Sequence, residues 1–258
     1  MDILLFSSLG ERFHKAFFFQ DRWKMYLEGI GNTILIAFLA VVIGIVIGVL
    51  LAMVNYVNKK SGKLRIASRF ANFYIMLIRG TPVVLQLMIL YFLVFFSWRV
   101  DYSFFGITLS SGIFIGAITF GLNSGAYVAE IARAGFESVD DGQMEAGRAL
   151  GLSTMQTMAS IITPQALRNC LPPLFNEFIM LVKETAVVGY VGIMDLGKIP
   201  GLIQSRTGDF MFPLIIAAVL YLVVVLLLTR ILRMIEKRLA KGDRDRGAVP
   251  NAKGGKVA

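Results

Sequence analysis

The sequence predicts an all-α polytopic membrane protein with five transmembrane helices. Of its 258 residues, 56% are hydrophobic and 17% are charged, whereas a soluble domain is about half apolar and a quarter charged. Four stretches contain no Asp, Glu, Lys or Arg: residues 29–58, 80–98, 102–129 and 210–229. At ~1.5 Å rise per residue, such stretches cross most or all of a ~30 Å hydrocarbon core. These observations exclude a soluble or disordered chain.

The first 28 residues mix aromatic side chains with charged ones. We expect an interfacial amphipathic segment on the extracytoplasmic side, with aromatic rings at the level of the lipid headgroups. This segment lacks the pattern of a cleavable signal peptide, so the first spanning helix is expected to direct insertion.

One transmembrane domain is expected over residues 29–238, followed by a disordered cytoplasmic tail at 239–258 that is rich in glycine and charge. The second helix should break at Gly80-Thr81-Pro82, because proline lacks the N–H that a helix needs. Gly44 and Gly48 are four residues apart, which favours close helix packing. The five helices are expected at residues 29–57, 71–98, 108–133, 169–194 and 210–234.

The distribution of basic residues predicts the orientation. Segments on the N-terminal side of the membrane hold 7 Lys and Arg residues, and those on the other side hold 18, with Lys183 inside a helix left out. Because cytoplasmic loops carry the excess of positive charge, we expect the N-terminus outside and the C-terminus in the cytoplasm.

The long cytoplasmic loop at residues 133–167 predicts two short helices, at 143–150 and 154–162. Ser153 is a plausible N-cap for the second helix. Gly151 lies between the two, where a chain reversal favours a residue without Cβ. Pro164 is expected to end the second helix. The hairpin presents an apolar ridge suited to a partner's groove.

This loop resembles the EAA loop of permease subunits from binding-protein-dependent ABC importers. The spacing of that motif is met by Glu145, Ala146, Gly147, Gly151, Ile161 and Pro164, with Arg148 beside the motif. Glycine at 147 replaces the usual second alanine. The resemblance implies that the loop forms coupling helices that dock on a cytoplasmic ATPase; the alternative is a helical hairpin that only caps the bundle.

Further matched segments place the chain near the polar amino-acid subgroup of that family, over roughly residues 29–238. They are Asn32-Thr33, Arg79-Gly80-Thr81-Pro82 with Gln86, Asn123 to Tyr127 with Glu130 and Arg133, Asn176-Glu177-Phe178 and Lys183-Glu184-Thr185. The resemblance implies a type I importer permease fold and several partners. These are a second permease (the same chain or a sibling), an ABC ATPase dimer, an extracytoplasmic substrate-binding protein and an amino-acid substrate.

Three charged residues, Glu177, Lys183 and Glu184, lie inside the fourth predicted helix. Each costs ~2.5–3.5 kcal/mol at membrane depth, so they should face a cavity or one another. Glu177 and Glu184 share one helical face because they are seven residues apart. They either line the translocation path and bind the substrate's ammonium group, or belong to a neutralising ion pair that fixes this helix against its neighbours. The full set of candidate path residues is Arg79, Thr81, Asn176, Glu177, Lys183, Glu184 and Thr185.

Other chemistries have little support. Arg79 either contacts substrate or anchors the helix at the interface. The chain has one Cys and one His, which excludes a disulfide framework and multi-His metal sites. It contains no phosphate-binding loop of the G-x-x-x-x-G-K-[ST] type, so it is not expected to hydrolyse ATP, and no cofactor is expected. Two further hypotheses are an ion-gradient-driven secondary transporter, which is often built from internal repeats, and a non-transporting membrane anchor for an ATPase.

Overall fold

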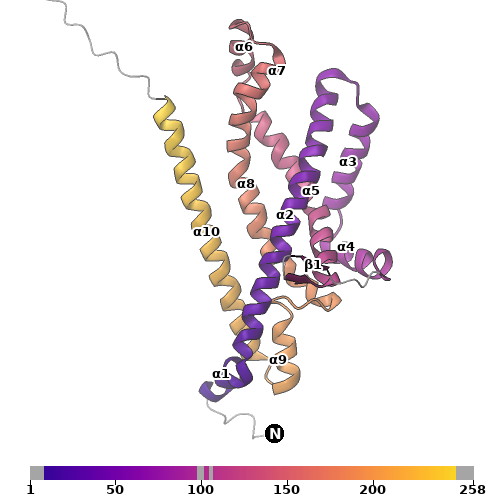
Figure 1. Ribbon diagram of the computed structural model, residues 1–258, viewed down its shortest axis with the longest axis vertical. Helices are drawn as coiled ribbons and strands as arrows, with labels where there is room; N and C mark the ends of the chain where they lie inside the picture. The colour runs from indigo at the N-terminus through magenta and orange to yellow at the C-terminus, as the bar shows by residue number, and fades with distance from the viewer. Residues whose placement is uncertain (1–8, 98–101, 105–106, 248–258) are drawn as a thin grey trace, which may run out of the picture.

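The computed structural model describes residues 9–97, 102–104 and 107–247 and confirms the helical fold class (Figure 1). The elements are α1 (Leu9–Phe17), η1 (Phe19–Asp21), α2 (Arg22–Ser61), α3 (Arg65–Arg79), α4 (Val83–Ile89), η2 (Leu90–Val94), β1 (Tyr102–Phe104), β2 (Ile107–Leu109), α5 (Ser111–Glu137), α6 (Gly142–Ala149), α7 (Thr154–Thr157), η3 (Met158–Ile162), α8 (Thr163–Glu184), η4 (Thr185–Val191), α9 (Ile199–Thr207) and α10 (Met211–Gly247). Here η1 and η4 are 3-10 helices, while η2 and η3 are π-helices. Figure 1 shows α6 and α7 at one end of the molecule and α1 and α9 at the other.

Within the described residues, three helices are long and apolar enough to cross a membrane, namely α2, α5 and α10. The bent pair α3–α4 makes a fourth span if it is counted as one. The helix α8 has 22 residues but carries Glu177, Lys183 and Glu184. It is not among the helices that are apolar enough to cross a membrane by this criterion. The count of five spans therefore stays a prediction, with α8 as the fifth.

The helices α2 and α5 pack closely along their lengths. A Cβ added to Gly44 would lie 2.7 Å from Ser124 Oγ, and one added to Gly48 would lie 2.6 Å from Val128 Cβ. The predicted close packing at these two glycines is thus confirmed. The main apolar core lies around this pair, where Ile36, Ala40, Leu87, Phe120, Leu181 and Val188 are buried.

The predicted break in the second span is confirmed, since the chain bends by 105° between α3 and α4. Gln86 stabilises the bend: its Nε2 donates to Ile78 O at 2.8 Å and to Thr81 O at 3.1 Å. These carbonyls lie where proline interrupts the helical hydrogen bonds. The pair starts at Arg65, six residues before the predicted start at 71.

The third predicted helix begins later than expected. Thr108 belongs to β2, which pairs antiparallel with β1, so that Phe104 lies opposite Ile107. The helix α5 begins at Ser111 because Ser110 is its N-cap, with the Ser110 side chain accepting from Ile113 N–H. It continues past the predicted end to Glu137.

The bounds of the fourth helix were predicted wrongly at both ends, and Pro164 does not end the hairpin helix. The chain is helical without interruption from α7 through η3 to α8, and Pro164 lies in the first turn of α8. The π-helix accounts for this: Thr163 N–H bonds to Met158 O, five residues back, so the backbone hydrogen bonds are already shifted where proline lacks its donor. The α-helix then ends at Glu184 and continues as the 3-10 helix η4.

The outer boundaries also differ from the predictions. The first spanning helix starts at Arg22, so it contains the last residues of the predicted interfacial segment. The helix α10 runs on to Gly247, so residues 239–247 are helical, not disordered as predicted. Glu, Lys, Arg and Leu, which favour helix, are frequent near this end. The remaining parts of both terminal segments, 1–8 and 248–258, lie outside the described residues.

Candidate functional site

The α6–α7 hairpin, residues 142–157, is held together by close contact between its two helices. Gly147 and Thr157 are both buried, and a Cβ added to Gly147 would lie 2.4 Å from Thr157 Cγ2. Thr157 Oγ1 donates to Ser153 O at 3.0 Å. Glycine at 147 therefore fits because the facing threonine occupies the space that an alanine side chain needs.

The turn of the hairpin depends on Gly151, whose φ is +84°. Gly151 N–H bonds to Arg148 O, and Leu152 N–H bonds to Gly147 O, which together form the Schellman arrangement at a helix C-terminus. Arg148 reinforces the turn, because its Nη1 donates to Leu152 O at 2.9 Å. Ser153 then caps α7 in a full capping box with Gln156. Its predicted role as the N-cap is confirmed.

The tip of the hairpin is apolar and exposed. Leu150 is 80% exposed and Met155 is 78% exposed, and the α6–α7 hairpin that carries them forms the end of the molecule shown at the top of Figure 1. Glu145 and Ala146 are also exposed. Large exposed apolar side chains beside a rigid turn are typical of a protein–protein contact.

The other two motif residues lie where the hairpin joins α8. Ile161 is half-buried in η3 and Pro164 is exposed in the first turn of α8. Gln165 Nε2 donates to Ile161 O at 2.9 Å and lies 3.3 Å from Gln143 Oε1. This contact joins the start of α6 to the start of α8, so the hairpin and α8 are connected by more than the chain itself.

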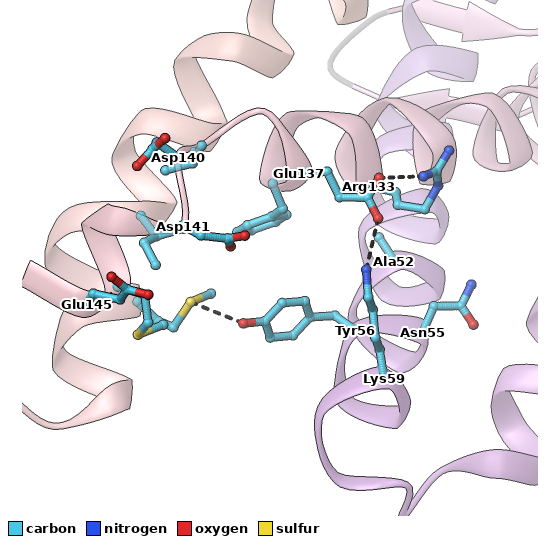
Figure 2. Close-up of a pocket in the computed structure, with 14 residues that line it drawn as sticks. Ala52, Asn55, Tyr56, Lys59, Arg133, Glu137, Asp140, Asp141 and Glu145 are labelled. Atoms are coloured by element: carbon cyan, nitrogen blue, oxygen red, sulfur yellow. Dashed lines mark hydrogen bonds and ion pairs between the residues drawn. The ribbon is translucent and has the colours of Figure 1, made fainter. Parts of the chain in front are cut away.

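A cleft of about 630 Å³ separates the hairpin from α2 and the end of α5. Figure 2 shows a chain of ion pairs along one wall: Lys59 contacts Glu137 at 3.3 Å, and Glu137 contacts Arg133 at 2.6 Å. A second contact crosses the cleft from α2 to η3, where Tyr56 OH donates to Met158 Sδ at 3.2 Å. These contacts tie α2 to both α5 and η3 near the base of the hairpin.

The candidate path residues on α8 do not meet the hairpin. Glu177 is half-buried, and its Oε1 accepts from Ser124 Oγ of α5 at 2.8 Å. Glu184 is half-buried and Lys183 is exposed. Among the described residues, no ion pair within 4.0 Å joins Lys183 to either glutamate.

The remaining candidates have different surroundings. Asn176 is exposed on α8, whereas Thr185 is buried and donates to Val182 O at 3.0 Å. At the bend, Arg79 lies over the ring of Tyr127, 5.2 Å from its centroid. Thr81 is exposed, and its Oγ1 donates to Leu77 O at 2.9 Å.

Sequence reasoning assigned no role to Gln86 and Asn123, although both lie in matched motifs. Asn123 Nδ2 donates to Gln86 Oε1 at 3.0 Å, so this pair connects the bent span to α5. Reasoning from the sequence also missed Asp195, which is fully buried. An acidic residue directly after an apolar stretch was the available signal, but its side-chain partner, Tyr221, lies on the distant helix α10.

The fold, the broken span and the hairpin together define a membrane component of a transport system. The chain matches the family "Binding-protein-dependent transport system inner membrane component" over residues 44–241. It belongs to this family, whose members are multi-pass permease subunits of the inner membrane. The family resemblance expected from the sequence is thereby confirmed.

Relatives and solved structures agree with this assignment. The chain is 41% identical over 221 residues to the putative glutamine transport system permease protein GlnP of Rickettsia bellii (strain RML369-C), covering 86% of this chain and 95% of that protein. It is 36% identical over 219 residues to the arginine transport system permease protein ArtQ of Bacillus subtilis (strain 168), covering 84% and 93%.

Among solved structures, a crystal structure of an amino acid ABC transporter with histidines matches with a TM-score of 0.72 and 37% identity, over 83% of this chain and 94% of that chain. An inward-facing structure of the MetNI methionine ABC transporter has a TM-score of 0.67 at 21% identity, covering 84% and 98%. That second likeness concerns the fold alone. The type I importer permease fold expected from the sequence is confirmed.

Proposed function

We propose that this chain is the permease subunit of an ATP-driven importer for a polar amino acid, coupled to a separate ATPase through the α6–α7 hairpin. The hairpin carries this proposal. It places Glu145, Ala146, Gly147 and Gly151 on the EAA spacing and exposes Leu150 and Met155 at its tip. The relatives that transport glutamine or arginine support a polar amino acid as substrate.

Force applied to the hairpin tip would reach the membrane through a short rigid route. The turn at Gly151 is closed by backbone hydrogen bonds, and α7 continues without a break into α8. Glu177 on α8 is in turn bonded to Ser124 on α5. A docked ATPase that closes on ATP would therefore move α8 against α5, which is how packed helices switch between discrete arrangements.

The exposed face of α8 supports a translocation path shared with a second permease. Asn176, Met180 and Lys183 are exposed and follow at spacings of four and three residues, so they lie on one face. A lysine facing lipid at this position is unfavourable. A water-filled path between two permeases gives Lys183 and Glu184 a polar environment, in which they can bind the carboxylate and ammonium groups of an amino acid.

The same arrangement supports a proposed orientation in the membrane. Figure 1 places the hairpin, the α2–α3 turn and the C-terminal end of α10 at one end of the molecule. This end carries Lys59, Arg65, Arg148 and Arg238. We propose that it faces the cytoplasm and the ATPase dimer, while α1 and α9 face the substrate-binding protein outside.

The first test is purification of the tagged chain from its native membrane in mild detergent, with mass spectrometry of the proteins that remain bound. We expect an ABC ATPase in about one-to-one ratio with total permease, where one-to-one is the stoichiometry that two coupling hairpins and two ATPases require. Recovery of a second permease sequence would indicate a heterodimer. Recovery of the chain without any ATPase would contradict the proposal.

The second test separates ATP-driven import from the gradient-driven alternative. The purified complex is reconstituted into proteoliposomes, with the binding protein outside and ATP inside, and uptake of radiolabelled polar amino acids is measured. We expect uptake to stop when ATP is replaced by a non-hydrolysable analogue while ion gradients are held constant. Uptake that continues without ATP and collapses with an ionophore would support a secondary transporter instead.

A further inference from the structure

Asp195 is a buried carboxylate that the mechanism above does not use. It has no exposed surface and lies in segment 192–198, which joins η4 to α9. Its Oδ1 accepts from Lys198 N–H at 2.9 Å. Its Oδ2 accepts from Gly197 N–H at 2.9 Å and from Tyr221 OH of α10 at 3.2 Å. Three donors thus converge on a carboxylate that is paired with no cation among the described residues.

The same segment is also fixed to α2. Asn32 Nδ2 donates to Met194 O at 2.7 Å, and Leu196 N–H donates to Thr33 Oγ1 at 3.1 Å. A Cβ added to Gly29 would lie 3.0 Å from Leu196 Cα, so the backbones of α2 and the segment are in direct contact. Segment 192–198 is therefore held between α2 and α10, and Asp195 supplies the side-chain link to α10.

The segment is directly preceded by η4, which itself follows Glu184 at the end of α8. Val188 and Val191 of η4 are buried in the main core with Leu87 of α4. Gly192, with φ of +83°, separates η4 from the segment. The helix α9, which follows the segment, lies at the opposite end of the molecule from the hairpin (Figure 1), so the segment joins the main core to that end.

The groups that face Asp195 determine how it responds to pH. They are Tyr221 of α10, Gly189 of η4, whose added Cβ would lie 3.5 Å from Oδ1, and the backbone N–H groups of Gly197 and Lys198. From α2, the uncharged Thr33 bonds to the adjacent Leu196 N–H. Burial raises the pKa of Asp195 to about 6, and the hydrogen bonds from Gly197, Lys198 and Tyr221 lower it in part. The carboxylate therefore gains a proton in mildly acidic medium.

A proton on Asp195 changes its hydrogen bonds to the three donors around it. The ionised carboxylate only accepts hydrogen bonds, whereas the protonated group carries a donor of its own. Hydrogen bonds to a neutral carboxyl are weaker than those to an ionised carboxylate, so the segment becomes less tightly held.

We propose that Asp195 is a positioning residue for the transport cycle: its ionised carboxylate holds segment 192–198 between α2 and α10, and protonation loosens this hold and slows uptake. The transport test of this inference rests on the proposed function. The structural test rests on the fold alone. The relevant pH is that on the α9 side of the membrane, where we place the substrate-binding protein.

The structural test uses hydrogen exchange of the intact complex, measured by mass spectrometry at several pH values. After correction for intrinsic exchange rates, we expect peptides that cover 193–199 to exchange faster as the pH falls through 6 in the wild type. In D195N, whose amide cannot be ionised, exchange should be fast at every pH. A wild-type segment whose corrected exchange does not change between pH 7 and pH 5 would overturn the inference, even if the proposed function fails.

The transport test measures ATP-driven uptake in proteoliposomes while the pH on the binding-protein side is varied and the inner pH is held constant. Wild-type uptake should fall about tenfold from pH 7 to pH 5, because the ionised fraction of a group with pKa near 6 changes by about that factor. D195N should show low uptake with no dependence on pH in this range. If D195N retains the wild-type profile, the inference is wrong.

Two further variants separate positioning from general stability. Y221F removes a donor that lowers the pKa of Asp195, so the midpoint of the uptake profile should move to higher pH. D209N changes a carboxylate near the same end, whose pKa is lowered by Arg12, and should leave the midpoint unchanged. A midpoint that moves in D209N and not in Y221F would contradict the proposed role. Absence of ATP-driven uptake in the wild type would count against the proposed function and leave the exchange result as the test.

Discussion

Gly147 and Thr157 face one another at the centre of the α6–α7 hairpin, and a Cβ on Gly147 would lie 2.4 Å from Thr157 Cγ2. Both residues are buried. The usual alanine of the EAA motif therefore does not fit in this chain without a change on α7. The two positions form one packing unit, and their effects should not be additive.

The first prediction is that Gly147→Ala destabilises the hairpin by ~1–3 kcal/mol, the usual cost of overpacking, and reduces the coupling of ATP hydrolysis to uptake. Thr157→Ala on its own removes Cγ2 and Oγ1, and the double variant should recover much of the coupling. The ratio of amino acid transported to ATP hydrolysed in proteoliposomes measures this. Equal coupling in Gly147→Ala and wild type would show that the contact has no role.

The second prediction concerns the turn at Gly151, where φ is +84°. A valine there should cost ~1–3 kcal/mol of backbone strain and uncouple ATP hydrolysis from uptake. Asn tolerates left-handed backbone conformations far better, so Gly151→Asn is the matched control and should retain most activity. Wild-type transport by Gly151→Val would contradict the role of the hairpin in coupling.

The third prediction concerns the exposed tip. Replacing both Leu150 and Met155 with alanine should weaken retention of the ATPase during purification, because these side chains supply exposed apolar surface for docking. Leu9 is 68% exposed on α1 at the opposite end, so Leu9→Ala is the control and should not affect retention. If the hairpin only caps the bundle, the amount of bound ATPase will be the same in all three proteins.

The fourth prediction separates the two interpretations of Glu177, which accepts from Ser124 at 2.8 Å. Glu177→Gln keeps an oxygen acceptor but removes the charge. If the carboxylate binds the substrate's ammonium group, uptake should fall about 10-fold or more, since a hydrogen bond to a charged group contributes ~1.5–3 kcal/mol, while thermal stability changes little. If it is structural, Ser124→Ala should lower stability and Glu177→Gln should transport normally.

The fifth prediction is a pH effect on stability at the opposite end. Arg12 holds the pKa of Asp209 below its usual range, assisted by the N–H groups of Met211 and Phe212. A lowered pKa stabilises the folded state above the ordinary pKa of Asp, about 4, and this contribution is lost as the pH falls through the folded value.

Asp209→Asn should therefore lower the thermal midpoint at pH 7, and the difference from wild type should shrink below about pH 4, where Asp in an unfolded chain is protonated. Thermal unfolding of the detergent-solubilised complex at pH 7, 5 and 3.5 measures this. A difference that stays constant over this range would mean that the ionised form of Asp209 contributes nothing to stability.

Much of the site could be predicted from local patterns. Ser153 and Gly151 were found because capping and chain reversal depend on a few neighbouring residues. The break at Gly80-Thr81-Pro82 was found for the same reason, since proline affects its own helix. Pro164 misled the prediction because the preceding π-helix had already shifted the hydrogen bonds.

The sequence by itself determined that the chain is a membrane protein with a hairpin on the EAA spacing, because apolar length and turn chemistry are properties of short stretches of chain. Only the tertiary structure decided which polar side chains meet. Ser124 and Glu177 are 53 residues apart, and Tyr221 and Asp195 are 26 apart. Such contacts depend on how the helices pack, and packing arises from the sum of many weak contacts over the whole bundle.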